Sequence, residues 1–166
     1  MFLAIISLFG ITAGACSGQS DSSLTQDEDN KRVAATAVHT AATGLGAILK
    51  DVSDENQQIK IIQEFIEPIR FYDDQSGYFY VYNYDCVNVA HAINKSLVGQ
   101  DLTNHKDMKG MLDIQALRDA AKAGGGYVTF YWPHPQTKIE QKKIGYVEPI
   151  PDTIFFIGTG YYPDTK

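Results

Sequence analysis

Three tyrosines alternate with hydrophobic residues in one short segment, which reads Tyr78-Phe79-Tyr80-Val81-Tyr82. Because successive side chains of a strand point to opposite faces, this spacing predicts one face of phenolic hydroxyls and one face of plain hydrophobes. A phenolic hydroxyl can donate to and accept from an oxyanion or a carbonyl, so the tyrosine face suits a small, partly polar ligand. Aromatic and β-branched residues also favour strands for packing alone, which leaves an ordinary core as the alternative. We expect one or two of the tyrosines to face a cavity.

Two cationic or titratable residues and a tryptophan accompany this segment. His91 can donate to a carboxylate, and would do so better when protonated, which would make binding sensitive to pH; a structural histidine is the alternative. Arg70 can hold a carboxylate through two charge-assisted hydrogen bonds, or it can pair at the surface with Glu67 or Asp73. Trp132 stands at the end of a predicted strand, where it lines a pocket or caps the core.

Composition and motifs argue against several classes of function. The net charge of −6 leaves no basic face for a nucleic acid. The sequence has no CxxC, no HExxH and no Cys/His cluster, so we expect neither a metal nor another cofactor. The four histidines and the carboxylates form no triad or acid pair, and Gly-x-Ser-x-Gly is missing, so we do not expect an enzyme.

The elements that must position these residues follow from periodicity and turn signals. Apolar residues at steps of three or four predict helices over 33–49 and 111–123, and a helix that begins after Ser53 or Asp54 and ends just before Pro68. The remaining segments predict a hairpin over 78–93, a loop over 94–109, and strands over 127–132, 142–149 and 153–161. A parallel sheet would need a helix after nearly every strand, so the order predicts an α+β domain with a roughly five-stranded antiparallel meander.

The N-terminal segment predicts export and lipid anchoring. Residues 1–15 are uncharged and apolar and predict a signal peptide, too short for a comfortable membrane span. The run Ala13-Gly14-Ala15-Cys16 resembles the bacterial lipobox, in which the cysteine is lipidated, although the positive start is missing and position 13 more often holds Leu. A plain secreted protein and a buried N-terminal helix are the alternatives. Residues 16–30, polar after the cysteine, predict a flexible tether, and residues 31–166 the folded domain.

Short motifs in a fixed order carry a family resemblance. They are Ile69-Arg70-Phe71, the run from Gly77 to Asn83, the run from Ala90 to Leu102, Gly124 to Val128, Tyr131-Trp132-Pro133, Lys143 to Val147 and Ile157 to Tyr161. The folded part resembles a single Cache domain of type 2, the PAS-like extracytoplasmic sensor of chemoreceptors and kinases. The resemblance implies long N-terminal helices packed on the antiparallel sheet, and a cavity for small organic acids such as acetate, propionate or pyruvate.

The same resemblance adds Lys143 and Tyr146, which match a Lys-x-x-Tyr strand of the family. Lys143 is then a second cation for a carboxylate. The two residues have opposite parity on a regular strand, so both reach one pocket only if a bulge intervenes.

Together these features predict a carboxylate-binding sensor domain in the periplasm or on the cell surface, lipid-anchored to a membrane. The sequence stops five residues after Tyr161, without a second hydrophobic span or a signalling region, so we expect chemotactic or other signal transduction to pass through a separate transmembrane receptor or kinase. The alternative is a protein-interaction module that docks on such a receptor and has no small ligand. Replacing Arg70 with Ala would separate the two, because only the first function needs a cation for a carboxylate.

Overall fold

The computed structural model describes residues 19–163, with side chains from residue 25 onward. The predicted signal peptide and the lipidation of Cys16 lie outside the described residues. The elements, in chain order, are α1 (Gln19–Leu49), α2 (Glu55–Ile66), β1 (Tyr80–Asn83), β2 (Asn88–His91), the 3₁₀ helix η1 (Lys95–Leu97), α3 (Asp113–Lys122), β3 (Gly126–Pro133), β4 (Glu140–Pro149) and β5 (Phe155–Tyr161).

The five strands form one antiparallel sheet in the order β2-β1-β5-β4-β3. The predicted α+β class with a five-stranded antiparallel sheet is therefore confirmed. The prediction of a simple meander was wrong, because β1 pairs with β5 and β2 does not pair with β3. The chain leaves β2 through residues 92–112 and α3, and this long connection carries it to the opposite edge of the sheet before β3 begins.

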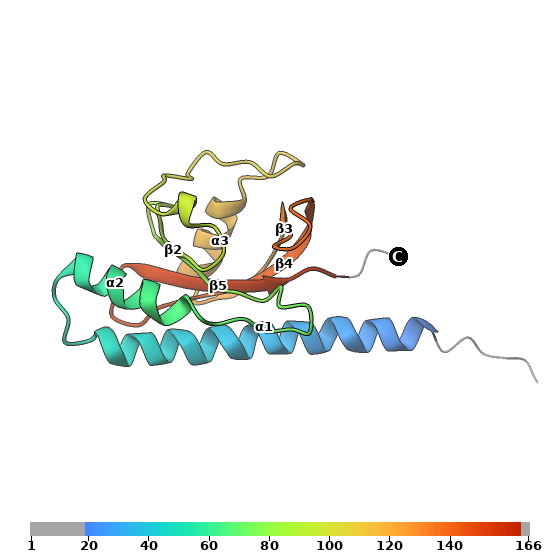
Figure 1. The fold of residues 1–166 in the computed structure, drawn as a ribbon, viewed down its shortest axis with the longest axis horizontal. Coiled ribbons are helices and arrows are strands. Elements are labelled where there is room, and N and C mark those ends of the chain that lie inside the picture. The colour runs from blue at the N-terminus through green and yellow to red at the C-terminus, as the bar shows by residue number, and fades with distance from the viewer. Residues whose placement is uncertain (1–18, 164–166) are drawn as a thin grey trace, which may run out of the picture.

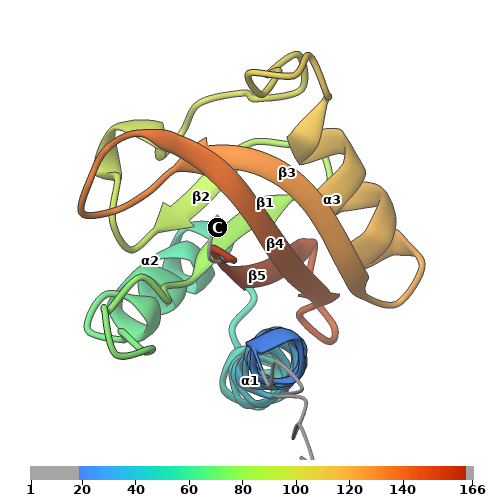
Figure 2. The ribbon, with the colours of Figure 1, turned by 90° about the vertical axis from the view of Figure 1, so that its right-hand side faces the viewer.

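The two faces of the sheet are covered by different helices. α1 runs along one face and packs on β4 and β5, while α3 packs on β3 and β4 from the other side (Figures 1 and 2). The alternation of side chains along the strands agrees with this arrangement. Tyr161 of β5 and Glu148 of β4 point to the same face, where Tyr161 contacts Asp27 of α1 and Glu148 contacts His39 of α1. α2 packs beside β2 at the sheet's edge. The connection over residues 92–112 lies on the same side of the sheet as α3 (Figure 1).

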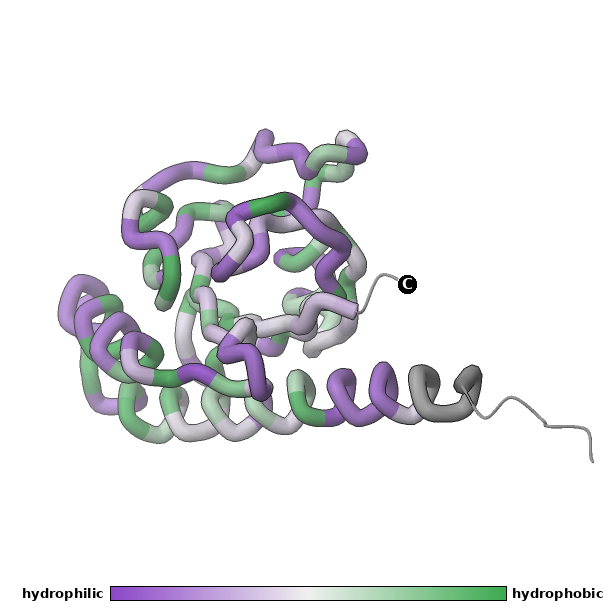
Figure 3. Tube along the Cα trace, turned by 45° about the vertical axis from the view of Figure 1, so that its right-hand side comes forward, coloured by the Kyte–Doolittle hydropathy of each residue, from purple (hydrophilic) through white to green (hydrophobic). Residues whose placement is uncertain are grey.

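α1 begins at Gln19, so residues 19–30 are helical where the composition predicted a flexible tether. The turns from residue 25 onward are hydrophilic (Figure 3), and charge pairs hold this part of the helix. Lys31 pairs with Asp27 at 3.2 Å and with Glu28 at 2.8 Å. The Tyr161 hydroxyl donates to Asp27 at 2.7 Å, so this part of α1 is also tied to the sheet.

α2 begins and ends where the sequence predicted. The Asp54 side chain accepts a hydrogen bond from the Gln57 N–H at 2.7 Å and caps the helix. The helix ends at Ile66, two residues before Pro68, which cannot continue it.

Gly160 offers a sharp test of how closely β4 and β5 approach. A Cβ at this position would lie 2.6 Å from the backbone oxygen of Ile144. Because backbone cannot yield as a flexible side chain can, we expect Gly160→Ala to destabilise the fold by about 1–3 kcal/mol in urea denaturation. Gly44→Ala in α1 is the control, since nothing lies within 4 Å of the new Cβ, and we expect it to stabilise by up to about 1 kcal/mol. Equal effects of the two substitutions would contradict this packing.

Candidate ligand-binding site

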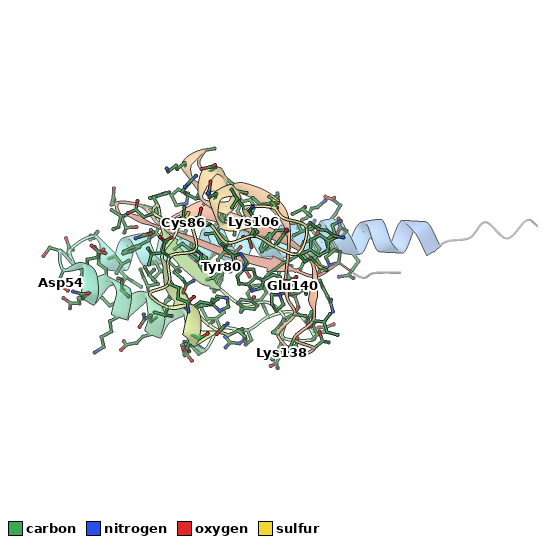
Figure 4. The ribbon with its side chains drawn as sticks, turned by 90° about the horizontal axis from the view of Figure 1, so that it is seen from above. Asp54, Tyr80, Cys86, Lys106, Lys138 and Glu140 are labelled. Carbon is green, nitrogen blue, oxygen red and sulfur yellow. The ribbon has the colours of Figure 1, made fainter. Side chains whose placement is uncertain are left out.

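A small cavity lies between the sheet and α3. Its lining combines aromatic rings, two aliphatic side chains of α3 and one lysine: Tyr80, Tyr82, His91, Ile114, Leu117, Phe130, Trp132 and Lys143. Tyr80 stands in the middle of the domain (Figure 4). The free volume is about 10 Å³, roughly the space of one water molecule. The cavity is therefore formed but closely filled by its own side chains.

A β-bulge decides which residues of β2 face this cavity. Tyr80 pairs with His91 and Tyr82 pairs with Asn88, so three residues of β1 (80–82) lie opposite four of β2 (88–91). On a regular strand His91 and Asn88 would point to opposite faces, and the extra residue brings both opposite the tyrosines. Both side chains are buried, with exposed fractions of 2% for His91 and 0% for Asn88.

Lys143 is the most unusual residue of the site. Its side chain is fully buried, and its Nζ makes no hydrogen bond to any residue that the structure describes. Three aromatic rings surround the ammonium, with Nζ 4.0 Å from the ring centre of Tyr78, 5.0 Å from Tyr162 and 5.5 Å from Tyr80. Such cation–π contacts offset part of the cost of desolvating the charge.

Burial lowers the pKa of Lys143 to about 7. A buried ammonium without an anion is costly, so near neutral pH a large fraction of this lysine is neutral. An anion placed against Nζ would restore the charged form. Within residues 25–163, where side chains are described, no carboxylate forms an ion pair with Lys143, so the site has a cation that its own residues do not balance.

His91 is held as a neutral hydrogen-bond donor. Its Nδ1 accepts from the backbone N–H groups of Ile93 at 3.2 Å and Asn94 at 2.9 Å, which places the ring proton on Nε2. Burial, followed by the charges of Lys143 and Arg70, lowers the pKa of His91 to about 3. With this pKa the histidine is neutral at ordinary pH, so we do not expect it to give binding a proton dependence.

Two of the residues that the sequence proposed lie outside the cavity. The Arg70 guanidinium donates to the backbone oxygens of Glu67, Ile69 and Ala92 at 2.6–3.0 Å, which ties the end of α2 to the segment after β2. Tyr146 lies on the face toward α1, because β4 pairs with β3 in unbroken register and no bulge changes its parity relative to Lys143. Its hydroxyl donates to Glu148 at 3.0 Å.

The other predicted residues come together. Tyr80, Tyr82, His91, Trp132 and Lys143 line the cavity, and Tyr78 lies directly behind Lys143 and 5.1 Å from the His91 ring. The Tyr80 hydroxyl donates to the backbone oxygen of Thr159 at 3.4 Å, near the long limit for a hydrogen bond. Burial raises the pKa of both Tyr78 and Tyr80 well above the ordinary value, so both remain protonated donors.

Residues 102–113, named the closing segment below, pack against Trp132, which lines the cavity. The His105 ring lies 5.3 Å from the Trp132 ring, and its Nδ1 is 2.8 Å from Oδ1 of Asp113. Asp113 is fully buried at the start of α3, and its Oδ2 has no hydrogen-bond partner among the described residues. The sequence prediction missed both Asp113 and Asn88, because an acid in the first turn of a helix and a polar residue at a turn look ordinary in sequence.

Asp107 fastens this closing segment to the sheet. Its carboxylate accepts from the backbone N–H groups of Lys109 and Met111, both at 2.9 Å, and of Tyr131 at 3.0 Å. Burial acts to raise the pKa of Asp107, but these hydrogen bonds outweigh it and hold the pKa below the usual range.

We expect Asp107→Ala to free residues 102–112 from β3, because three N–H groups lose their acceptor. The loss should cost about 1–3 kcal/mol in thermal or urea unfolding, and amide exchange should accelerate in this segment first. Asp101→Ala is a comparison, since Asp101 is exposed and its carboxylate accepts from the N–H of Thr103, at 2.8 Å, and not from β3. Unchanged exchange at 102–112 in the Asp107 variant would contradict this role.

Two negative observations complete the description. Within residues 19–163, no group of three or more His, Cys, Asp or Glu side chains is placed to hold a metal ion. In the same range no helix has the length and apolar character needed to cross a bilayer.

Solved structures resemble this fold closely. A methyl-accepting chemotaxis protein of Vibrio parahaemolyticus RIMD 2210633 superposes with a TM-score of 0.76 and 28% identity, over 87% of this chain and 96% of that one. A Cache chemosensory domain, described for its recognition of carboxylic acids, superposes with a TM-score of 0.68 and 24% identity, over 89% of this chain and 100% of that one. At this lower identity the second likeness is one of fold.

Sequence comparison points the same way. The sensor histidine kinase MctS of Rhizobium johnstonii (strain DSM 114642 / LMG 32736 / 3841) is 33% identical over 90 residues, which are 54% of this chain and 20% of that protein. The chain thus corresponds to only about a fifth of the kinase's length. The profile dCache_2, described as a Cache domain, matches residues 29–165. This chain therefore belongs to the Cache domain family of sensor domains.

Proposed function

We propose that the chain is a sensor domain that binds a small carboxylate in the cavity between the sheet and α3. The observation that carries the proposal is Lys143, a fully buried ammonium with aromatic rings around it and no anionic partner among residues 25–163. A ligand carboxylate would supply that anion. The neutral His91 offers an Nε2–H, and the cavity tyrosines offer hydroxyls that burial keeps protonated.

Binding must be accompanied by movement of the lining side chains. The free volume of about 10 Å³ is smaller than any carboxylic acid. Trp132 is only partly buried and contacts His105 of the closing segment, so we expect a shift of this pair to enlarge the cavity. Such a shift couples ligand entry to residues 102–112, which is what a sensor requires.

Isothermal titration with acids of two to four carbons tests the proposal. An acetate-sized ligand with four non-hydrogen atoms gains at most about 1.5 kcal/mol per atom, which limits the dissociation constant to about tens of micromolar. We expect binding in the micromolar to millimolar range for at least one acid, together with thermal stabilisation. The absence of both effects across the panel would refute the proposal, and consumption of an acid would indicate an enzyme instead.

The proposed setting is extracytoplasmic, with Cys16 as the lipid anchor and a separate membrane receptor or kinase as the signalling partner. The export-like N-terminal sequence supports this setting. Metabolic labelling with a radioactive fatty acid tests it, since Cys16→Ser should remove the label and Cys86→Ser should not.

One observation favours a second candidate, a module that docks on another protein and binds no small molecule. The cavity is nearly filled by its own side chains. Under this alternative Lys143→Met would leave capture of the partner intact, and no acid would stabilise the wild-type chain.

A further inference from the structure

Tyr162 was not among the residues predicted from the sequence, and it reaches the buried lysine from beyond the last strand. It follows Tyr161, where β5 ends, and consecutive residues of an extended chain point to opposite sides. Tyr161 donates to Asp27 on the α1 side, so Tyr162 turns to the other side, where its ring centre lies 5.0 Å from Nζ of Lys143. The residue therefore belongs to the surroundings of the ligand-holding cation without lining the cavity itself.

Hydrogen bonds hold the Tyr162 ring in this position. Its hydroxyl donates to the backbone oxygen of Pro133 at 2.9 Å, at the end of β3, and its ring centre lies 4.6 Å from that of His134. The hydroxyl of Tyr78 is hydrogen-bonded to that of Tyr162. The two rings nearest to the ammonium of Lys143 are thus tied to each other and to the turn between β3 and β4.

Tyr162 also belongs to the surface of the protein. It is only partly buried and lines an open surface pocket together with Tyr72 and Asp74, whereas Lys143 is fully buried. Because Tyr162 contacts both the pocket and the lysine, its side chain helps to keep water from Nζ. An ammonium without water is destabilised unless other groups replace that water, and the negative face of an aromatic ring is such a group.

We infer that Tyr162 is a positioning residue, whose ring keeps Lys143 in the protonated form that a ligand carboxylate needs. This inference rests on the proposed function for its effect on binding, whereas the protonation of Lys143 can be measured without a ligand. Burial places the pKa of Lys143 at about 7, so a small loss of support for the charge makes the lysine neutral within the ordinary pH range. Of the three rings around Nζ, those of Tyr78 and Tyr80 are buried in the core, so Tyr162 is the one that can be replaced at least cost to the fold.

The other titratable groups around Lys143 and Tyr162 can be told apart from the lysine. His91 faces Lys143 and is neutral above pH 5, because its pKa is about 3. On the outer side of Tyr162 lie His134 and Asp74, which are 3.5 Å apart. Burial acts to raise the pKa of Asp74, but hydrogen bonds outweigh it and hold the pKa below the usual range. Burial raises the pKa values of the surrounding tyrosines, which stay protonated: Tyr78, Tyr80 and Tyr162. His134 is the remaining group, so the test includes its replacement.

Tyr162→Met removes the ring and keeps an apolar side chain of similar length beside Lys143. The protonation of Lys143 is followed on the full chain without ligand, by NMR of the lysine εCH₂ resonances between about pH 5 and 10, and Lys143→Met identifies the resonance by its loss. We expect the titration midpoint to fall by at least about half a pH unit in Tyr162→Met. It should stay within about 0.2 units of the wild type in Tyr162→Phe, which keeps the ring, and in His134→Gln.

An unchanged or raised midpoint in Tyr162→Met would overturn the inference, and so would an equal fall in Tyr162→Phe, since the hydroxyl would then be responsible. If Tyr162→Met does not fold, Tyr162→Leu provides the second reading, with the same expected fall and the same contrary outcomes.

Titration calorimetry with propionate measures the effect on binding. At pH 8 we expect Tyr162→Met to bind at least about threefold more weakly than the wild type, whereas at pH 6, where the lysine is mostly charged in both, the affinities should differ less than about twofold. Tyr162→Phe should follow the wild type at both pH values. An equal loss at both would indicate a merely structural role and overturn the inference, with the proposed function left standing. If no small acid binds the wild type, the proposed function fails, and the NMR midpoints still decide whether Tyr162 keeps Lys143 charged.

Discussion

Replacing Lys143 with Met is expected to abolish carboxylate binding and to stabilise the fold at the same time. Removing one partner of a buried, hydrogen-bonded charge pair costs about 2–5 kcal/mol, so affinity should fall by at least about 30-fold. The stability change has the opposite sign, because the lysine is fully buried and burial lowers its pKa to about 7. Met has nearly the same shape and no charge to desolvate, so we expect a gain of up to about 4 kcal/mol near neutral pH.

The opposite signs separate this prediction from simple misfolding. A damaged variant would lose both binding and stability, whereas the expected variant binds worse and melts later. Lys142→Met is the matched control, since Lys142 is the exposed neighbour on the same strand and should change neither quantity by much. Titration calorimetry and urea denaturation measure the two effects. A Lys143→Met chain that kept its affinity, or that was less stable than the wild type, would contradict the role given to this residue.

The fold was predictable where local signals and tertiary packing agree. The Asp54 cap, the stop before Pro68 and the alternating tyrosines each specify their own element, and the structure has these elements where predicted. The helical turns before Lys31 were not predictable from hydrophobic pattern. They are stabilised by ion pairs along the helix and by the Tyr161 hydroxyl on Asp27, which comes from the far end of the chain.

The candidate site was predictable only in part, for a geometric reason. Strand parity correctly grouped Tyr80 with Tyr82, and it also explains why Tyr146 cannot share a face with Lys143. Parity fails at a bulge, so the presence of both His91 and Asn88 on the face that carries the tyrosines could not be read from the sequence. The position of Asp113 depends on how residues 92–112 cross the sheet, and long loops carry little pattern from which to infer their course.

The affinity for propionate is expected to be level from about pH 6 to 7 and to fall about tenfold per pH unit above that. The carboxylate binds the protonated lysine, and Lys143 loses its proton with a pKa of about 7 in the free protein. The other titratable groups that face Lys143 do not interfere, since Tyr78, Tyr80 and Tyr162 have raised pKa values and His91 titrates near 3. Above pH 7, binding should be accompanied by the uptake of close to one proton per ligand. Calorimetry in buffers of different ionisation enthalpy measures this number.

The stability of the protein alone should follow pH in the opposite direction. Between about pH 7 and 9 the unfolded lysine keeps its proton while folded Lys143 has lost it, so the unfolded state binds more protons and stability rises with pH. The Lys143→Met variant should lack this rise of stability with pH, which would assign the rise to Lys143. Affinity that stayed level to pH 9 would show that the ligand does not meet a titrating lysine. Affinity that improved below pH 6 would instead assign the proton dependence to a histidine, against the neutral His91 that the backbone N–H groups of Ile93 and Asn94 enforce.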